Sequence, residues 1–196
     1  MKRFFDFTVS LLLIILLSPL FVIIGIIVLI DDGGPVVFKQ YRVKKDNKLF
    51  FIYKFRTMKN NTRHTSTVAL TEAAFQITKS GRFLRKTSLD ELPQLFNVLL
   101  GDMSFVGPRP LIPEEKEIRA LRKEYNVYSV KPGITGLAQV NGRDNLSIKE
   151  KALFDKEYID KQSIALDIKI LIKTVLVVLK REDIKEGGEP DNTRKI

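Results

Sequence analysis

The chain has 196 residues, enough for one compact domain of ordinary size but fewer than two independently cored domains usually need. Its 33 Lys and Arg against 23 Asp and Glu give a formal net charge of +10, which suits a partner rich in phosphate, such as nucleic acid, anionic lipid or a nucleotide. The absence of Cys excludes disulfides, thiolate chemistry and Cys-based zinc sites, and the single His64 argues against a His-dependent triad.

The first predicted element is the apolar segment Phe7–Ile30, in which no residue is charged. A straight helix of this length would reach ~36 Å and could cross the ~30 Å hydrocarbon core of a bilayer. Ser18 and Pro19 stand at its middle, where Pro removes a backbone donor and should bend the helix. The segment is therefore predicted to be a membrane helix that is broken at Ser18-Pro19.

Basic residues flank this segment on both sides, with Lys2 and Arg3 before it and a series beginning at Lys39 after it. Positive charge marks the cytoplasmic side of a membrane segment, so both ends are expected at the same face. These features predict a re-entrant helix-break-helix over residues 1–33. A Pro-kinked helix that spans the membrane is the alternative.

The pattern then changes to β structure. Val36–Val43 and Lys48–Phe55 are rich in Val, Phe, Tyr and Ile, and Lys45–Asn47 between them is typical of a turn, so we predict a small β-hairpin. Lys54 and Arg56 alternate with hydrophobic neighbours and would share one face of the second strand.

Several further elements complete the predicted α+β fold. Gly81–Thr87 is expected to be a basic connector, and helices are expected at Ser88–Leu100, at Pro113–Tyr125 with the charged composition of an exposed helix, and at Ile164–Leu179 with the amphipathic composition of a helix on a core or a bilayer surface. Val130–Asn145, rich in Gly and Pro, is expected to be a shaped loop. Residues 34–181 would form one catalytic domain, and residues 182–196 a polar, flexible tail.

The densest group of charged residues lies around two adjacent carboxylates, Asp90 and Glu91. Arg85 and Lys86 precede them and Pro93 follows, and Pro is comfortable only in the first turn of a helix. Nearby cations and a positive helix end would keep both carboxylates ionised, as a nucleophile and a metal ligand must be. Ser88 and Glu91 also match a capping box, which is the structural alternative and is compatible with the functional one.

Two more clusters can supply phosphate-binding cations. Arg109 lies between Pro108 and Pro110, which fix the backbone on both sides of it, so its guanidinium would be presented rigidly for bidentate phosphate binding. A rigid structural turn with a solvated Arg is the alternative. Lys131–Gly136 and Asn141–Arg143 add glycines and two cations, a weak phosphate-loop signal when taken alone.

Four ordered blocks of this sequence resemble the bacterial sugar transferases: Lys54–Met58, Ser88–Val98, Gly101–Pro110 and Lys131–Arg143. The resemblance is closest to the small monotopic phosphoglycosyl transferases that initiate glycoconjugate assembly, a family that includes the initiating enzyme of Campylobacter-type N-linked glycosylation. It covers nearly everything from Lys2 to about Arg181, and no large N-terminal membrane or sugar-modifying domain is expected.

The resemblance implies a reaction. Sugar-1-phosphate would pass from a UDP-sugar to polyprenyl (undecaprenyl) phosphate, with release of UMP and a covalent aspartyl-phosphosugar intermediate on Asp90. Glu91 would be a ligand of the Mg²⁺ cofactor. The substrate-binding cations would be Lys54, Arg56, Arg85, Arg109 and Arg143.

The resemblance also implies a cellular location and a membrane topology for the protein. It would be monotopic, with its re-entrant helix broken at Ser18-Pro19 and its catalytic body at the cytoplasmic face of a bacterial inner membrane. Its partners would be the UDP-sugar donor, the polyprenyl phosphate acceptor, membrane lipid and a second copy in a homodimer, but no nucleic acid.

Two other functions are compatible with parts of the sequence. A non-enzymatic basic module that binds anionic lipid or nucleic acid would explain the charge but not the paired carboxylates. A direct ternary-complex transferase, in which Asp90 is only a metal ligand, would keep every motif and change the order of the chemistry. Release of UMP without acceptor distinguishes all three.

Overall fold

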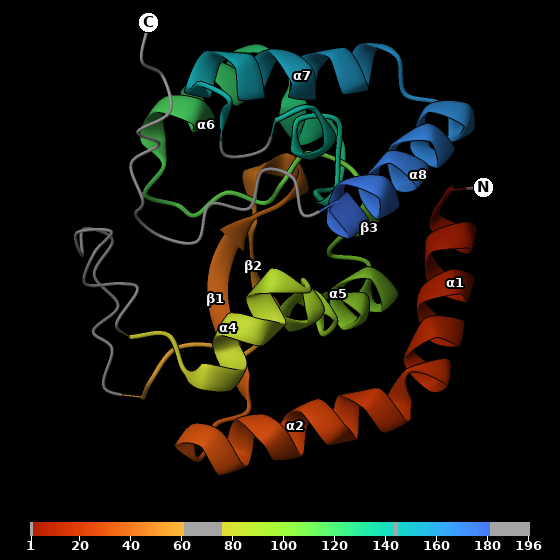
Figure 1. The fold of residues 1–196 in the computed structure, drawn as a ribbon. Coiled ribbons are helices and arrows are strands. Elements are labelled where there is room, and N and C mark those ends of the chain that lie inside the picture. Colours follow the sequence, from red (N-terminus) through yellow and green to blue (C-terminus); the bar gives the residue numbers. More distant parts are fainter. Residues whose placement is uncertain (1, 61–75, 143–144, 181–196) are drawn as a thin grey trace, which may run out of the picture.

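The computed structural model describes residues 2–60, 76–142 and 145–180, which form an α+β body with a bent pair of helices at its N-terminal end (Figure 1). The α+β class predicted from the sequence is confirmed. Arg143 and the predicted tail 182–196 lie outside the described residues.

The bent pair consists of α1 (Lys2–Leu16) and α2 (Ser18–Asp32), whose axes meet at 62°. Pro19 lies in the first turn of α2, where its missing N–H has no helical partner to lose. Ser18 Oγ donates a hydrogen bond of 2.8 Å to the carbonyl of Ile15, whose usual helical donor would be residue 19, where Pro19 has no N–H. The predicted break is confirmed. In Figure 1, α1 runs along one side of the body and α2 along its lower edge.

Each helix of the pair has 15 residues and is therefore about 22 Å long. Among the described helices, none is long and apolar enough by itself to cross a membrane, whereas α1 and α2 together have the required length and composition. Ile24 and Val28 face the body and are buried. Large apolar side chains cover the outer surface of the pair, among them Phe4, Leu12, Ile15, Leu16, Val22, Ile23 and Ile30. An exposed apolar surface of this extent marks contact with a membrane or a partner.

A β-hairpin follows the helix pair, as predicted. β1 (Val37–Val43) and β2 (Leu49–Phe55) pair in antiparallel fashion, with Val37 opposite Phe55 and Val43 opposite Leu49. The connecting turn contains Asp46 with φ 59° and Asn47 with φ 56°. Asp and Asn tolerate this left-handed conformation better than most residues, so the turn forms where the sequence places them.

Two short helices pack against the hairpin. α4 (Lys79–Lys86) replaces the connector expected at Gly81–Thr87, and the Thr78 side chain caps it by accepting a hydrogen bond from the N–H of Gly81. α5 (Gln94–Leu100) lies beside β2, where its Val98 is fully buried with Phe50 and Ile52 of the strand.

Asn97 of α5 fastens this helix to the free edge of β2. Its Nδ2 donates to the carbonyl of Phe51 at 2.7 Å, and its Oδ1 accepts from the N–H of Tyr53 at 3.0 Å. The fully buried amide thus bonds two backbone groups of β2, as a neighbouring strand would.

The C-terminal half contains a second, two-stranded sheet. β3 (Ser104–Val106) pairs in parallel with β4 (Gly133–Thr135), so the expectation of a loop throughout Val130–Asn145 is wrong at β4. The pairing brings the Gly133 and Gly107 backbones into contact, and a Cβ on Gly133 would lie 2.1 Å from the Gly107 nitrogen. Only glycine fits this approach.

Three helices cover this half: α6 (Lys116–Glu124), α7 (Ile148–Asp160) and α8 (Ile164–Lys180). α6 and α8 confirm the predicted helices, whereas α7 was not predicted. In Figure 1, α6 and α7 lie together at the top, and α8 runs from there toward β3. Val106, Tyr158 and Ile170 form the core between α7, α8 and the small sheet.

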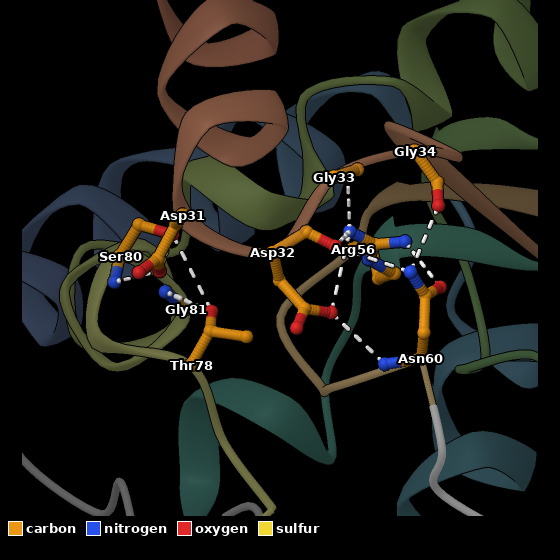
Figure 2. A network of polar contacts seen from close by, with 9 residues as sticks. All are labelled: Asp31, Asp32, Gly33, Gly34, Arg56, Asn60, Thr78, Ser80 and Gly81. Atoms are coloured by element: carbon orange, nitrogen blue, oxygen red, sulfur yellow. Dashed lines mark hydrogen bonds and ion pairs between the residues drawn. The ribbon is translucent and has the colours of Figure 1, made fainter.

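Figure 2 shows how the end of α2 is tied to the body. Asp31 accepts hydrogen bonds from the backbone N–H and the hydroxyl of Ser80, at 2.8 and 2.6 Å. Asp32 pairs with Arg56 at 3.4 Å and accepts a bond from the Asn60 N–H at 2.9 Å. The last turn of α2 is therefore held at two points, by the start of α4 and by the segment that follows β2.

Replacement of Asn97 by Ala should destabilise the protein by about 2 kcal/mol, because it removes a fully buried amide and leaves a part-buried carbonyl and a part-buried N–H of β2 without partners. Thermal or denaturant unfolding in detergent measures this loss. The matched variant Lys149→Ala removes an exposed side chain and should change stability by less than about 0.5 kcal/mol. Equal stabilities of the two variants would contradict the role of Asn97.

Candidate active site

The paired carboxylates lie in a single 3₁₀ turn, Leu89–Glu91, between α4 and α5. Ser88 precedes this turn in the left-handed conformation, with φ 56°, and its side chain caps no helix. The predicted capping box at Ser88 and Glu91 is therefore wrong, because the left-handed backbone directs the chain into a 3₁₀ turn before α5 begins at Gln94. A capping box does form elsewhere, between Ser147 and Glu150 of α7.

Lys54 of β2 reaches the two carboxylates. Its Nζ lies 2.6 Å from Oε1 of Glu91 and 4.0 Å from Oδ2 of Asp90. All three side chains are largely buried, with exposed fractions of 19% for Lys54, 12% for Asp90 and 14% for Glu91. The hairpin and the 3₁₀ turn thus bring one cation to two anions that are 36 and 37 positions away in sequence, which the sequence pattern could not show.

Arg109, from another part of the chain, also approaches the Glu91 carboxylate. Its Nη2 lies 3.5 Å from Oε1 of Glu91, and 41% of its side chain remains exposed. Arg42 of β1 lies nearby, and burial together with the charge of Arg109 lowers the pKa of its guanidinium to about 10. Arg42 was not singled out from the sequence, because a basic residue on a hairpin strand usually lies on a solvated face.

Burial and the neighbouring opposite charges shift the pKa values of Asp90 and Lys54 in opposite directions. Burial raises the pKa of Asp90 above its ordinary value of 3.8, and Lys54, Arg85 and Arg109 oppose this rise. Burial lowers the pKa of Lys54, and Glu91 and Asp90 oppose that change. The carboxylates and the ammonium therefore stabilise one another in their charged forms.

Arg85 of α4 adds a further positive charge near Asp90. Its Nε donates a hydrogen bond of 2.8 Å to the hydroxyl of Thr57, and its charge lowers the pKa of Asp90. Thr57, which was not singled out from the sequence, orients the guanidinium by accepting this bond.

Arg56 does not join the residues around the dyad. Its side chain is 7% exposed, and its guanidinium donates to the carbonyls of Asp32 and Gly33 and to the side chain of Asn60 (Figure 2). β2 ends at Phe55, so the strand alternation that would place Arg56 beside Lys54 does not extend to it. Its described contacts hold the end of α2.

The donor set at the site is compatible with Mg²⁺. Within residues 2–60, 76–142 and 145–180, no three acidic or imidazole side chains gather into a metal cage. Mg²⁺, however, is commonly held by one or two carboxylates, several waters and the phosphates of a substrate. Asp90 and Glu91 are adjacent hard oxygen ligands of this kind, and their chemistry fits the ion.

This arrangement can bind and attack phosphate. The partly exposed Arg109 can receive a phosphate oxygen, while Arg85 and Lys54 keep the adjacent carboxylate charge balanced. A carboxylate held in its ionised form beside such cations can act as a nucleophile toward phosphorus, because the cations offset the repulsion between the two anions.

Comparison with known proteins identifies relatives over almost the whole chain. The model of the bacterial sugar transferase family matches residues 1–181. The undecaprenyl-phosphate galactose phosphotransferase of Salmonella typhimurium is 42% identical over 93% of this chain and 41% of its own length. The UDP-glucose:undecaprenyl-phosphate glucose-1-phosphate transferase of Klebsiella pneumoniae is 45% identical over 89% of this chain and 39% of its own length.

A third relative, the uncharacterized sugar transferase EpsL of Bacillus subtilis, is 42% identical over 95% of this chain and 91% of its own length. The chain therefore spans about two fifths of the first two relatives and nearly all of the third.

Replacement of Lys54 by Met should raise the pKa of Asp90 further, because it removes the nearest charge that opposes the effect of burial. The Asp90 carboxylate should then protonate at higher pH than in the unmodified protein. A pH titration followed by carbon NMR of labelled Asp side chains measures this. Lys149→Met, far from the dyad in sequence and exposed, is the control. An unchanged or lowered Asp90 pKa in Lys54→Met would refute the electrostatic role of Lys54.

Proposed function

The chain belongs to the bacterial sugar transferase family, and we propose that it transfers a sugar-1-phosphate from a UDP-sugar to polyprenyl phosphate and releases UMP. The names of the Salmonella and Klebsiella relatives support undecaprenyl phosphate as the acceptor, and the Klebsiella name supports a UDP-sugar as the donor. The two names give galactose and glucose, so UDP-galactose and UDP-glucose are the candidate donors.

One observation carries the proposed mechanism. The Asp90 side chain is 12% exposed, adjacent to Glu91, and within 4.0 Å of the Lys54 ammonium, whose charge favours the ionised form of this mostly buried carboxylate. A residue that served only to balance surface charge would not need such burial, which raises its pKa.

In the first step, an Asp90 oxygen attacks the sugar-linked phosphorus of the donor. The new bond joins this oxygen to phosphorus, and the bond between phosphorus and the bridging oxygen breaks, so that UMP leaves with the electron pair. Arg109 and Arg85 would bind the phosphate oxygens and reduce their repulsion of the carboxylate. Mg²⁺ held by Glu91 and the donor's phosphates would supply further positive charge.

In the second step, a phosphate oxygen of the polyprenyl phosphate attacks the same phosphorus. The bond to Asp90 breaks, the carboxylate is restored, and the product is a polyprenyl diphosphosugar. A two-step route needs one phosphate site that both substrates occupy in turn, and the single cluster around Asp90 is consistent with that requirement.

The helix pair explains how a lipid acceptor reaches this cluster. We infer that α1 and α2 enter and leave the same membrane face, at the cytoplasmic side of a bacterial inner membrane. The exposed apolar surface of the pair and the 62° bend support this arrangement. The outer residues of α8, among them Ile164, Ile168 and Ile172, would lie on the bilayer surface.

Replacement of Asp90 by Asn should abolish both UMP release and covalent labelling by a UDP-sugar with a radioactive sugar, because an amide is a poor nucleophile. UDP-glucose and UDP-galactose are the donors to test first. The purified unmodified chain should release UMP without acceptor, up to about one equivalent. Asp160→Asn, an exposed carboxylate of α7 that pairs with Lys156, is the matched control and should retain labelling.

Two results would decide against this mechanism. Phosphosugar labelling of a folded Asp90→Asn protein would exclude Asp90 as the nucleophile. UMP release that occurs only when polyprenyl phosphate is present would favour direct transfer in a ternary complex.

The re-entrant arrangement predicts the accessibility of single cysteines in this Cys-free chain. Cysteines introduced at Lys2, before the apolar segment, and at Lys39, after it, should both resist a membrane-impermeant thiol reagent in intact cells and react once the membrane is opened. A cysteine at Lys149 reports the side on which the body lies. Labelling at position 2 alone from outside would establish a spanning helix pair.

A further inference from the structure

A buried ion pair joins α6 to α7. Arg122 of α6 and Asp155 of α7 have side chains that are 5% and 1% exposed. Two bonds join them: Nε lies 2.8 Å and Nη2 lies 2.6 Å from Oδ2 of Asp155. Burying both charges is costly, and two apolar side chains of similar volume would join the helices about as well. The pair therefore calls for an explanation other than the packing of α6 on α7.

The third nitrogen of Arg122 supplies that explanation. Its Nη1 donates a hydrogen bond of 2.7 Å to the backbone carbonyl of Arg109. Pro108 and Pro110 on either side fix φ at their own positions and restrict the backbone of the residue before each. The bond to Arg122 fixes the direction of the peptide unit between Arg109 and Pro110, and so the direction in which the Arg109 side chain leaves the backbone.

Neighbouring carbonyls of the same segment are also held. Tyr158, one turn after Asp155 on α7, donates to the carbonyl of Val106 at 3.1 Å. The Gly133 N–H donates to the carbonyl of Pro108 at 3.0 Å, and Arg42 Nη1 donates to that of Pro110 at 3.4 Å. α7 is thus connected at two places to the segment that carries Arg109, through Asp155 and Arg122 at the Arg109 carbonyl and through Tyr158 at the Val106 carbonyl.

We propose that Asp155, acting through Arg122, is a positioning residue that sets the Arg109 guanidinium at the Asp90–Glu91 dyad. Asp155 orients the guanidinium of Arg122 by accepting its hydrogen bonds. The same guanidinium donates to the Arg109 carbonyl, and the Arg109 side chain lies within 3.5 Å of Glu91. This inference rests on the proposed function, because it takes Arg109 as the group that binds the donor's phosphates.

The test is a double-mutant cycle. Arg122→Met/Asp155→Leu replaces the pair with apolar side chains of similar volume, which should preserve the fold but remove the bond to Arg109. UDP is the probe, and its dissociation constant is measured by calorimetry in the presence of Mg²⁺. The replacement should weaken UDP binding about tenfold when Arg109 is present, since small displacements of a phosphate-binding group are costly. In an Arg109→Ala background it should weaken binding less than about twofold.

Lys156→Met/Asp160→Leu is the matched control, because it removes an exposed ion pair from the same helix α7. It should leave the affinity for UDP unchanged in both backgrounds. If the Arg122→Met/Asp155→Leu protein does not fold, Asp155→Asn provides the same cycle, since the amide keeps the shape of the side chain and removes its charge. The KM for the UDP-sugar should then rise more than kcat falls.

Equal losses of UDP affinity with and without the Arg109 side chain would show that the pair acts only through the fold and would overturn the proposal. Unchanged affinity in a folded Arg122→Met/Asp155→Leu protein would overturn it as well. UMP release from UDP-glucose and from UDP-galactose, with polyprenyl phosphate present, is measured on the same unmodified preparation. Its absence would refute the proposed function, whereas UMP release together with equal losses would refute only the positioning role.

Discussion

The candidate site depends on one ammonium group, Lys54 Nζ, which is largely buried between the carboxylates of Asp90 and Glu91. Two adjacent carboxylates in a mostly buried turn repel each other and favour protonation, while a buried ammonium favours deprotonation. Lys54 therefore opposes the rise that burial causes in the pKa of Asp90, and both carboxylates oppose the fall that burial causes in the pKa of Lys54. The contact can form only if β2 and the Leu89–Glu91 turn keep their relative position, which gives a reason for Asn97 to bond the free edge of β2.

Rigid backbone is the second requirement, because Arg109 comes from a segment far from Lys54 in sequence. The segment Gly107–Pro110 has two prolines, a glycine packed against the Gly133 backbone, and carbonyls bonded by Arg122 and Arg42. Such a segment would lose little conformational entropy on binding a phosphate, since its geometry is set before a ligand arrives.

The sequence correctly predicted those structural features that depend on residues close to one another in the chain. Pro19 and Ser18 mark the break in the helix pair, and Asp46 and Asn47 mark the hairpin turn, because proline geometry and left-handed conformers act within a few residues. Sequence-based prediction failed for features that the residue types and their immediate neighbours do not determine. Gly133–Thr135 is a strand only because β3 lies beside it, and Ser88 is no helix cap because its backbone is left-handed. Arg122 escaped notice because the charged composition of α6 resembles that of an exposed helix.

The ends of the helix pair are tied to the segments that carry the site. At the end of α2, Asp32 pairs with Arg56, which follows Lys54 by two residues in the chain. At the start of α1, Lys2 pairs with Asp167, which accepts a hydrogen bond of 2.8 Å from Tyr158, the residue that holds the Val106 carbonyl. Both connections run through buried or half-buried polar groups, whose loss would leave unpaired charges. If the helix pair lies in a bilayer as proposed, its depth there would set where Lys54 and Arg109 lie relative to the membrane surface, and a lipid phosphate would meet the dyad at a fixed height.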